Sequence, residues 1–170
     1  MRIKRTAPPP DTLIQRYLPA DHADAFSCAI EAGRTITPDD IQVAFWAYQP
    51  MWMERLLFLR DILVKPFGLQ SGGKKNARII DDCIRNDVPH RLMHVAVKSP
   101  AETVLCLEDS HLTAYFSVAV LPGAAEKAEI VATTVVHIKN RLGRLYFCLI
   151  RPLHCVIMPR MLSHSVRKLI

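Results

Sequence analysis

Apolar and polar residues alternate in distinct ways along the chain, and each pattern predicts an element. Residues 25–31, AFSCAIE, have the period-two alternation of a half-buried strand. Thr37 and Pro38, followed by two aspartates, form a typical helix start and predict a helix over about residues 38–48. The stretch MWMERLLFLRDILV predicts a second helix that ends before Pro66, with one face formed by Trp52, Leu56, Leu59 and Leu63.

The pattern changes in the second half of the chain. GLQSGGKKN, residues 68–76, is expected to be a loop, and ARIIDDCI a short helical turn. From residue 91, four segments rich in β-branched and aromatic residues are separated by short turns: RLMHVAV, ETVLCLED, LTAYFSVAVL and EIVATTVVHIK. They predict four consecutive antiparallel strands, the third with Phe116 on an apolar face and Tyr115 on the other.

The last predicted element is an amphipathic helix over residues 141–162. At 100° per residue, one sector of this helix is apolar, and Arg144 and Arg151 lie opposite it. Pro152 is expected to kink the helix or mark a join. We expect the preceding sheet to cover the apolar sector, which contains Leu142, Leu145, Tyr146, Leu149, Ile150, Leu153, Val156 and Ile157.

Length and composition indicate one folded domain. The chain has 170 residues, half of them apolar and 22% charged, which is the balance of a packed protein. Residues 1–16 contain three consecutive prolines and are expected to form a flexible N-terminal segment, followed by a single domain over residues 17–170. The net charge of +6 favours anionic partners without naming one.

Cysteine usage and the chain start bear on the compartment. The five cysteines form no CxxC pair, which indicates reduced thiols and a cytoplasmic location. MRIKRTAPPPDTL lacks the apolar stretch of a secretory signal, and no segment has the length of an uninterrupted transmembrane span.

Four blocks of the sequence resemble a bacterial family. The blocks are YLPADHADAF, RDILVKPFGL, LCLEDSHLTAYFSV and TTVVHIKNRLGRLYFCLIRPLHCVIMPRML, and the resemblance extends from Tyr17 to Leu162. This family is known only as a domain of unknown function and is sometimes fused to epimerase-like reductases, which implies a reductase-type protein as an associate. The element order resembles the START-like or polyketide-cyclase-like helix-grip architecture. The resemblance therefore implies an α+β fold in which an antiparallel sheet wraps around a long C-terminal helix.

Two polar groups are candidate sites. Asp109, His111 and Tyr115 surround a predicted strand turn; an aspartate can orient a histidine as general base, and a tyrosine can donate to an oxyanion. Alternatively, Asp109 only shapes the turn and His111 is a surface residue. The second, ligand-binding group comprises His137, Asn140, Arg144 and His154.

Three residues of the second group also have explanations that involve no ligand. Asn140 is a natural helix N-cap, Arg144 either meets an anion or is solvated, and His154 is either a ligand contact or a structural histidine.

No metal site and no cofactor are expected. His90 and His94 lie on an extended segment that separates them. GLQSGGKK, residues 68–75, approaches a phosphate-binding loop, but Lys75 replaces the hydroxyl residue and no strand precedes it.

The favoured function is a binding domain for a small hydrophobic molecule or lipid, held in a cavity between the sheet and the C-terminal helix. Polar residues such as Tyr115 and His137 would orient the ligand there. Two alternatives remain open: a cyclase- or hydrolase-like enzyme that uses the same cavity, and a peripheral protein whose residues 141–162 contact an anionic membrane surface. Nucleic-acid binding is disfavoured because the basic residues are scattered without stacking aromatics.

Overall fold

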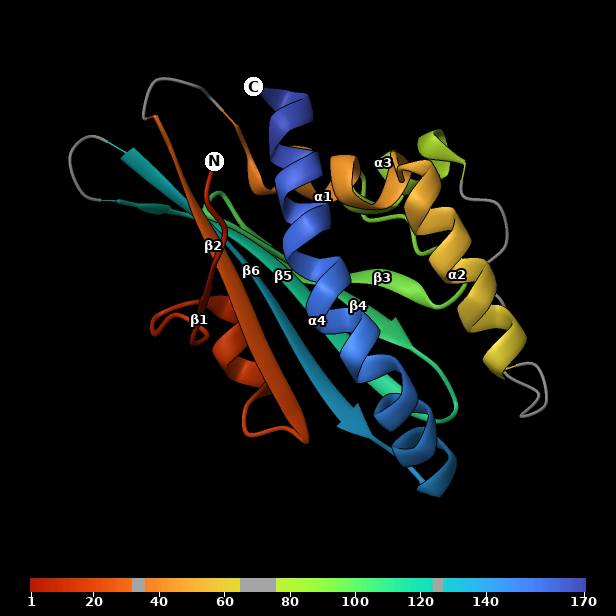
Figure 1. Cartoon of the computed structure of the whole chain (residues 1–170). Coiled ribbons are helices and arrows are strands. Elements are labelled where there is room, and N and C mark those ends of the chain that lie inside the picture. Colours follow the sequence, from red (N-terminus) through yellow and green to blue (C-terminus); the bar gives the residue numbers. More distant parts are fainter. Residues whose placement is uncertain (32–35, 65–75, 124–126) are drawn as a thin grey trace.

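The computed structural model describes residues 1–31, 36–64, 76–123 and 127–170. The near-match to a phosphate-binding loop, residues 68–75, lies outside these ranges. The described residues form one antiparallel six-stranded sheet with the order β1-β2-β6-β5-β4-β3 (Figure 1). The strands are β1 (Lys4–Thr6), β2 (His22–Glu31), β3 (Met93–Ser99), β4 (Glu102–Glu108), β5 (Leu112–Pro122) and β6 (Lys127–Ile138).

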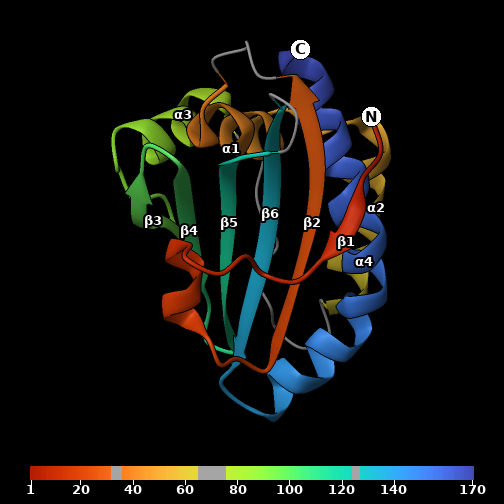
Figure 2. The same ribbon diagram turned by 90° about the vertical axis from the view of Figure 1, so that its left-hand side faces the viewer.

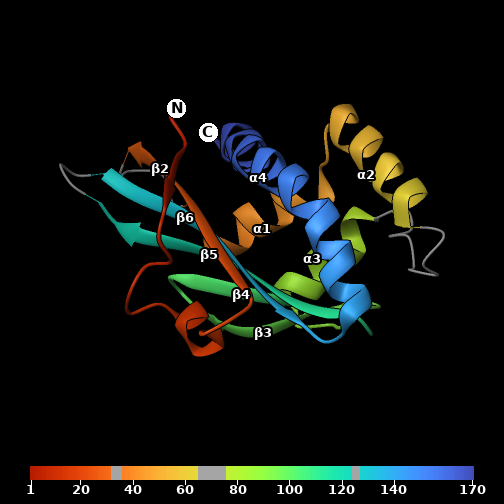
Figure 3. The same ribbon diagram turned by 60° about the horizontal axis from the view of Figure 1, so that its bottom comes forward.

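The helices gather mainly on one face of this sheet. They are η1 (Leu13–Tyr17), α1 (Pro38–Ala47), α2 (Met51–Val64), α3 (Ala77–Arg85) and α4 (Arg141–Leu169). Figures 1 and 3 show α1, α2 and α4 on the same side of the sheet, with α4 crossing it diagonally. The predicted α+β, helix-grip arrangement is confirmed: an antiparallel sheet with a long C-terminal helix laid across it.

Local sequence signals account for the helix starts. Thr37 accepts a hydrogen bond from the Asp40 amide at 3.2 Å, and the Asp40 carboxylate accepts one from the Thr37 amide at 2.9 Å, which completes a capping box at α1. Asn140 caps α4 by accepting from the Gly143 amide at 2.9 Å. These two predicted boundaries are confirmed. Beyond its predicted end at residue 162, α4 continues to Leu169 and passes through Pro152 and Pro159.

The main core lies between the sheet and the C-terminal half of α4. Phe26, Phe116 and Ile130 on the strands pack with Met161 and Leu162 of α4, and all five side chains are buried. The predicted alternation of β5 is confirmed, since Phe116 and Val118 face this core while Tyr115 packs with residues of the other face.

The first sixteen residues contain regular structure, although structure was expected to begin near Tyr17. β1 pairs with β2, and η1 packs its buried Ile14 against Val104 and Val135 on the sheet face opposite α4. Figure 2 shows this N-terminal segment running across that face. Its anchor is the buried Glu102, whose carboxylate accepts hydrogen bonds from the Leu13 and Ile14 amides.

Candidate functional site

The N-terminal half of α4 covers the sheet incompletely. From Arg144 to Ile157 no side chain is buried, whereas Met158, Met161, Leu162 and Val166 further along are. Leu145, Leu149 and Val156, which the helical pattern placed in the sector covered by the sheet, are exposed. That prediction was wrong for these three residues because they lie on the exposed side of α4, which faces away from the sheet.

An apolar row lies on the helix-covered face of the sheet, at the end where α4 begins. Val136, Ala114 and Leu107 are direct cross-strand neighbours on β6, β5 and β4. Val136 is buried, but Ala114 and Leu107 are only half-buried, as are the neighbouring Leu112 and Ile138. We call Val136, Ala114 and Leu107 the apolar row. The interface between helix and sheet is thus closed at one end and partly open at the other.

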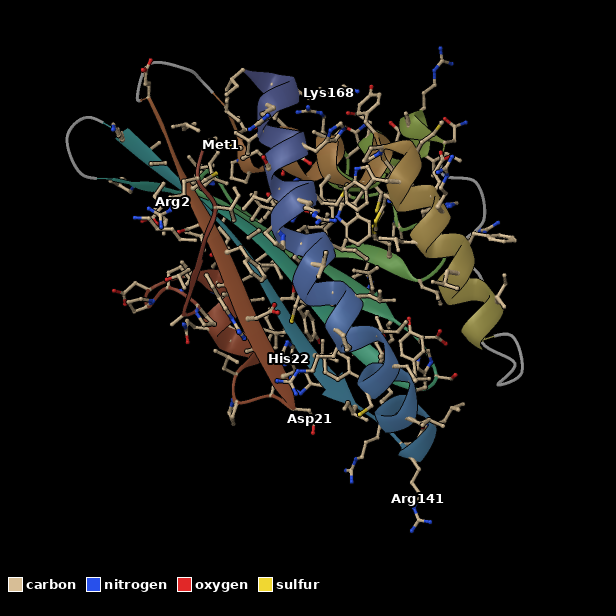
Figure 4. All side chains as sticks on the ribbon, in the orientation of Figure 1. Met1, Arg2, Asp21, His22, Arg141 and Lys168 are labelled. Atoms are coloured by element: carbon tan, nitrogen blue, oxygen red, sulfur yellow. The ribbon has the colours of Figure 1, made fainter. Side chains whose placement is uncertain are left out.

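A polar cluster lies at the β2 end of the apolar row. His22 pairs in register with Val136, and Asp24 pairs with Thr134, the next residue on the same face of β6. His154 approaches from α4, and its Nε2 lies 3.1 Å from Asp24 Oδ1. His22 Nε2 lies 3.3 Å from Asp24 Oδ2. We call His22, Asp24 and His154 the His–Asp–His cluster; Figure 4 shows His22 between the end of β2 and α4.

Burial makes the charge of Asp24 consequential. Its side chain is fully buried, and burial alone would raise the pKa of the carboxyl; contacts from His154 and His22 outweigh that effect and lower the pKa below its ordinary value. The aromatic ring of Phe147 packs beside His22 at 5.0 Å between centroids, which shields this end from solvent.

His154 is the predicted site residue that reaches this cluster. His22 and Asp24 were not singled out from the sequence, although they precede Phe26 and Cys28 at two-residue intervals and so share their face. Polar residues at the start of an apolar strand face are the signal that could have identified them. The cluster also joins two of the resemblance blocks, YLPADHADAF and the C-terminal one.

Tyr115 and His137 lie on the opposite face of the sheet. Tyr115 stacks on Tyr17 of η1 at 3.8 Å between ring centroids, and His137 Nε2 donates to the Tyr17 carbonyl at 2.9 Å. The expectation that these two side chains orient a ligand beneath the C-terminal helix is therefore wrong. Successive strand residues alternate faces, so Tyr115 cannot point with its neighbours Ala114 and Phe116.

Asp109 and His111 remain together at the turn between β4 and β5. His111 Nδ1 lies 3.3 Å from Asp109 Oδ2, and the His111 ring meets Tyr146 of α4 edge-on at 4.8 Å. Asp109 also accepts from the Ser110 amide at 2.6 Å, as a turn-shaping aspartate does. Tyr115 lies on the opposite face of the sheet. The proposed catalytic group of Asp109, His111 and Tyr115 therefore does not converge on one site.

Asn140 and Arg144 occupy the start of α4. Besides capping the helix, Asn140 donates to the Ser110 carbonyl at 3.1 Å and so joins α4 to the β4–β5 turn. Arg144 is exposed. The ligand-binding group predicted from the sequence is thus spread over three places: the cluster, the start of α4 and the opposite face.

The protein is an α+β domain of helix-grip type, in which a long C-terminal helix crosses the sheet. A half-covered apolar row and a buried polar cluster lie on the face of the sheet that this helix covers. The chain belongs to the family described as "Protein of unknown function (DUF2867)", whose model matches residues 17–161.

Comparison with other proteins adds little beyond the family. None of the curated proteins matches this chain in sequence. A similar solved structure is the crystal structure of TTHA0849 from Thermus thermophilus, at 12% identity and a TM-score of 0.29. The match covers 87% of this chain and 94% of that one.

Proposed function

We propose that this chain is a binding domain for a small hydrophobic molecule or lipid, which it holds between the apolar row and the N-terminal half of α4. The proposal rests on a difference in burial between the two ends of the interface between α4 and the sheet. Met161 and Leu162 are fully buried at one end, while Ala114 and Leu107 remain half-buried at the other. Apolar surface that the fold leaves incompletely covered favours an apolar occupant.

The site has to open to admit a ligand. Two hollows of about 300 and 340 Å³ are open to solvent and lined by residues of α1 and α3, the second also by the end of α4. Neither includes the apolar row. No side chain from Arg144 to Ile157 is buried, so, among the described residues, outward movement of this part of α4 has to break only the contacts of Tyr146 with His111, of Phe147 with His22 and of His154 with Asp24.

The energetic gain from a bound chain is large enough to drive such opening. At about 0.8 kcal/mol per buried methylene, ten methylenes supply roughly 8 kcal/mol before ordering costs are subtracted. The His–Asp–His cluster at the end of the row would meet the polar end of such a ligand.

Decanoic acid is a suitable probe for this site. In native mass spectrometry we expect one decanoate per chain, and Ala114→Leu should lower its affinity about tenfold, because the added side chain fills the row. Ala96→Leu is the matched control: Ala96 is also half-buried but packs on the η1 side of the sheet. Equal losses in both variants, or no binding by the unmodified chain, would refute the proposal.

A specific surface favours a second candidate function, attachment to an anionic membrane. Four exposed residues of α4 follow helical spacing on one face, Leu145, Leu149, Pro152 and Val156, and the exposed Arg144 and Arg151 border them. On α2, Met51 and Phe58 are 70% and 67% exposed. Phe58 is therefore a surface residue. Figure 3 shows α2 and α4 on the same side of the sheet.

By length and composition alone, α4 is also long and apolar enough to cross a membrane, and 17% of its most apolar 18-residue window is buried. The expectation that no segment has such a length was therefore too strict. Core helices of soluble proteins meet the same criteria, and the bordering arginines suit a helix that lies along the surface.

Flotation with vesicles of phosphatidylcholine and phosphatidylglycerol tests this candidate. We expect recovery with the mixed vesicles, a loss of most of it in Leu149→Glu, and little change in Val88→Glu, which charges an exposed apolar residue after α3. No recovery of the unmodified chain, or equal losses in both variants, would eliminate membrane attachment.

A further inference from the structure

We propose that the His–Asp–His cluster binds one divalent transition-metal ion, with His22, Asp24 and His154 as ligands. The sequence patterns predict no metal site because His90 and His94 do not converge. The cluster uses other residues: two from the start of β2 and one from the middle of α4, 130 positions away in the chain. The inference concerns a different chemistry from hydrophobic ligand binding and stands independently of it.

The distances suit a metal ion. The three ligand atoms lie within 4.8 Å of one another, and both imidazoles present Nε2 to the same carboxylate, at 3.3 and 3.1 Å. Around a tetrahedral ion with bonds of about 2.0–2.2 Å, ligand atoms lie roughly 3.3–3.5 Å apart. The two contacts of Asp24 have similar lengths but involve different oxygens, Oδ2 towards His22 and Oδ1 towards His154, so binding of one ion requires small movements of the three side chains.

Buried polar atoms at this place lack hydrogen-bond partners. The approach of His22 Nε2 to Asp24 Oδ2 does not have hydrogen-bond geometry, so both buried atoms are unsatisfied among the residues that the structure describes. Thr134 Oγ1, on the strand beside Asp24, is a third such atom. An unsatisfied buried group costs about 1–3 kcal/mol. A cation bound by the imidazole and the carboxylate would remove two of these penalties together.

The negative charge of the buried Asp24 also favours a bound metal ion. Asp24 is fully buried, and within the described ranges its ion-pairing neighbours are His22 and His154, with no lysine or arginine among them. Metal-binding imidazoles are neutral, so a divalent cation would supply the positive charge that the buried carboxylate requires.

The ligand set restricts which metals fit. Two imidazole nitrogens and one carboxylate oxygen suit Zn²⁺, Co²⁺ or Fe²⁺, whereas Mg²⁺ and Ca²⁺ prefer sites made only of oxygens. Three protein ligands also leave coordination positions for a further molecule, as in metal sites that act on a bound partner.

Calorimetric titration of the metal-stripped full chain with Zn²⁺, Co²⁺ and Mg²⁺ tests the proposal. We expect one Zn²⁺ or Co²⁺ per chain and no measurable binding of Mg²⁺. Asp24→Asn and His154→Ala should each weaken Zn²⁺ binding at least about tenfold. His164→Ala, a change to another histidine of α4 outside the cluster, should leave the affinity unchanged.

A second measurement on the unmodified chain keeps the test independent of how the variants fold. Bound Co²⁺ should shift the imidazole proton resonances of its ligands His22 and His154 far outside the diamagnetic range, and those of the non-ligand His137 much less. Absence of Zn²⁺ and Co²⁺ binding, or affinities that do not change in the two cluster variants, would overturn the site. Decanoate binding by the metal-stripped chain is measured separately, so failure of the metal site and failure of the ligand site are distinguishable.

Discussion

Replacing Gly143 with alanine is expected to destabilise the protein by about 3 kcal/mol. In an ordinary helix position this change stabilises by up to about 1 kcal/mol, because alanine has the higher helix propensity. Here an added Cβ would lie 2.1 Å from the carbonyl oxygen of His111, a backbone atom that cannot rotate away. The same carbonyl accepts the Lys139 amide at 3.0 Å, so retreat of the turn would also break that hydrogen bond.

Urea unfolding followed by circular dichroism measures this effect. Arg144→Ala, at the exposed neighbouring position of α4, should leave the midpoint nearly unchanged. A Gly143→Ala protein as stable as the unmodified chain would mean that α4 does not begin against the β4–β5 turn. The start of α4 would then no longer explain why His154 lies over β2.

Replacing Glu102 with glutamine is expected to lower the free energy of unfolding by about 2–3 kcal/mol. The buried carboxylate accepts hydrogen bonds from the Leu13 and Ile14 amides and from the Ser117 hydroxyl. An amide has one oxygen acceptor in place of two and brings an NH2 group towards these donors, so at least one buried donor is left unsatisfied. The loss should be concentrated where η1 meets the sheet.

Hydrogen exchange locates that loss. The amides of Leu13 and Ile14 should exchange much faster in Glu102→Gln, while those of β5 and β6 change with global stability only. Glu129→Gln, an exposed carboxylate on β6, is the matched control and should change neither. Unchanged protection of η1 in Glu102→Gln would show that other contacts hold the N-terminal segment in place.

Most of the fold was predictable because its signals are local. The alternation in β5 and the Thr37 cap at α1 each depend on a few neighbouring residues, and both are confirmed. The docking of η1 was not predictable, since it depends on Glu102, nearly ninety positions later. The division into a flexible segment and a domain from residue 17 stays a prediction, although β1 and η1 show regular structure before that point.

The site was less predictable because it depends on which elements meet. His154 was recognised as a polar residue at the edge of an apolar helix sector, but its partner Asp24 lies in a segment interpreted only as a strand start. Tyr115 and His137 looked suitable by residue type, and strand alternation places them on the other face. Helical spacing also could not show that Leu149 lies on the exposed side of α4.

The central claim, an apolar ligand between the apolar row and α4, is tested most directly by titrating methyl-labelled protein with decanoate and following the methyl resonances by NMR. We expect shifts at Leu107, Leu112 and Ile138, around the apolar row, and none at Ile14, Val104 and Val135 on the η1 side. Shifts of equal size on both faces of the sheet, or shifts confined to exposed methyl groups such as those of Leu149 and Ile62, would contradict it.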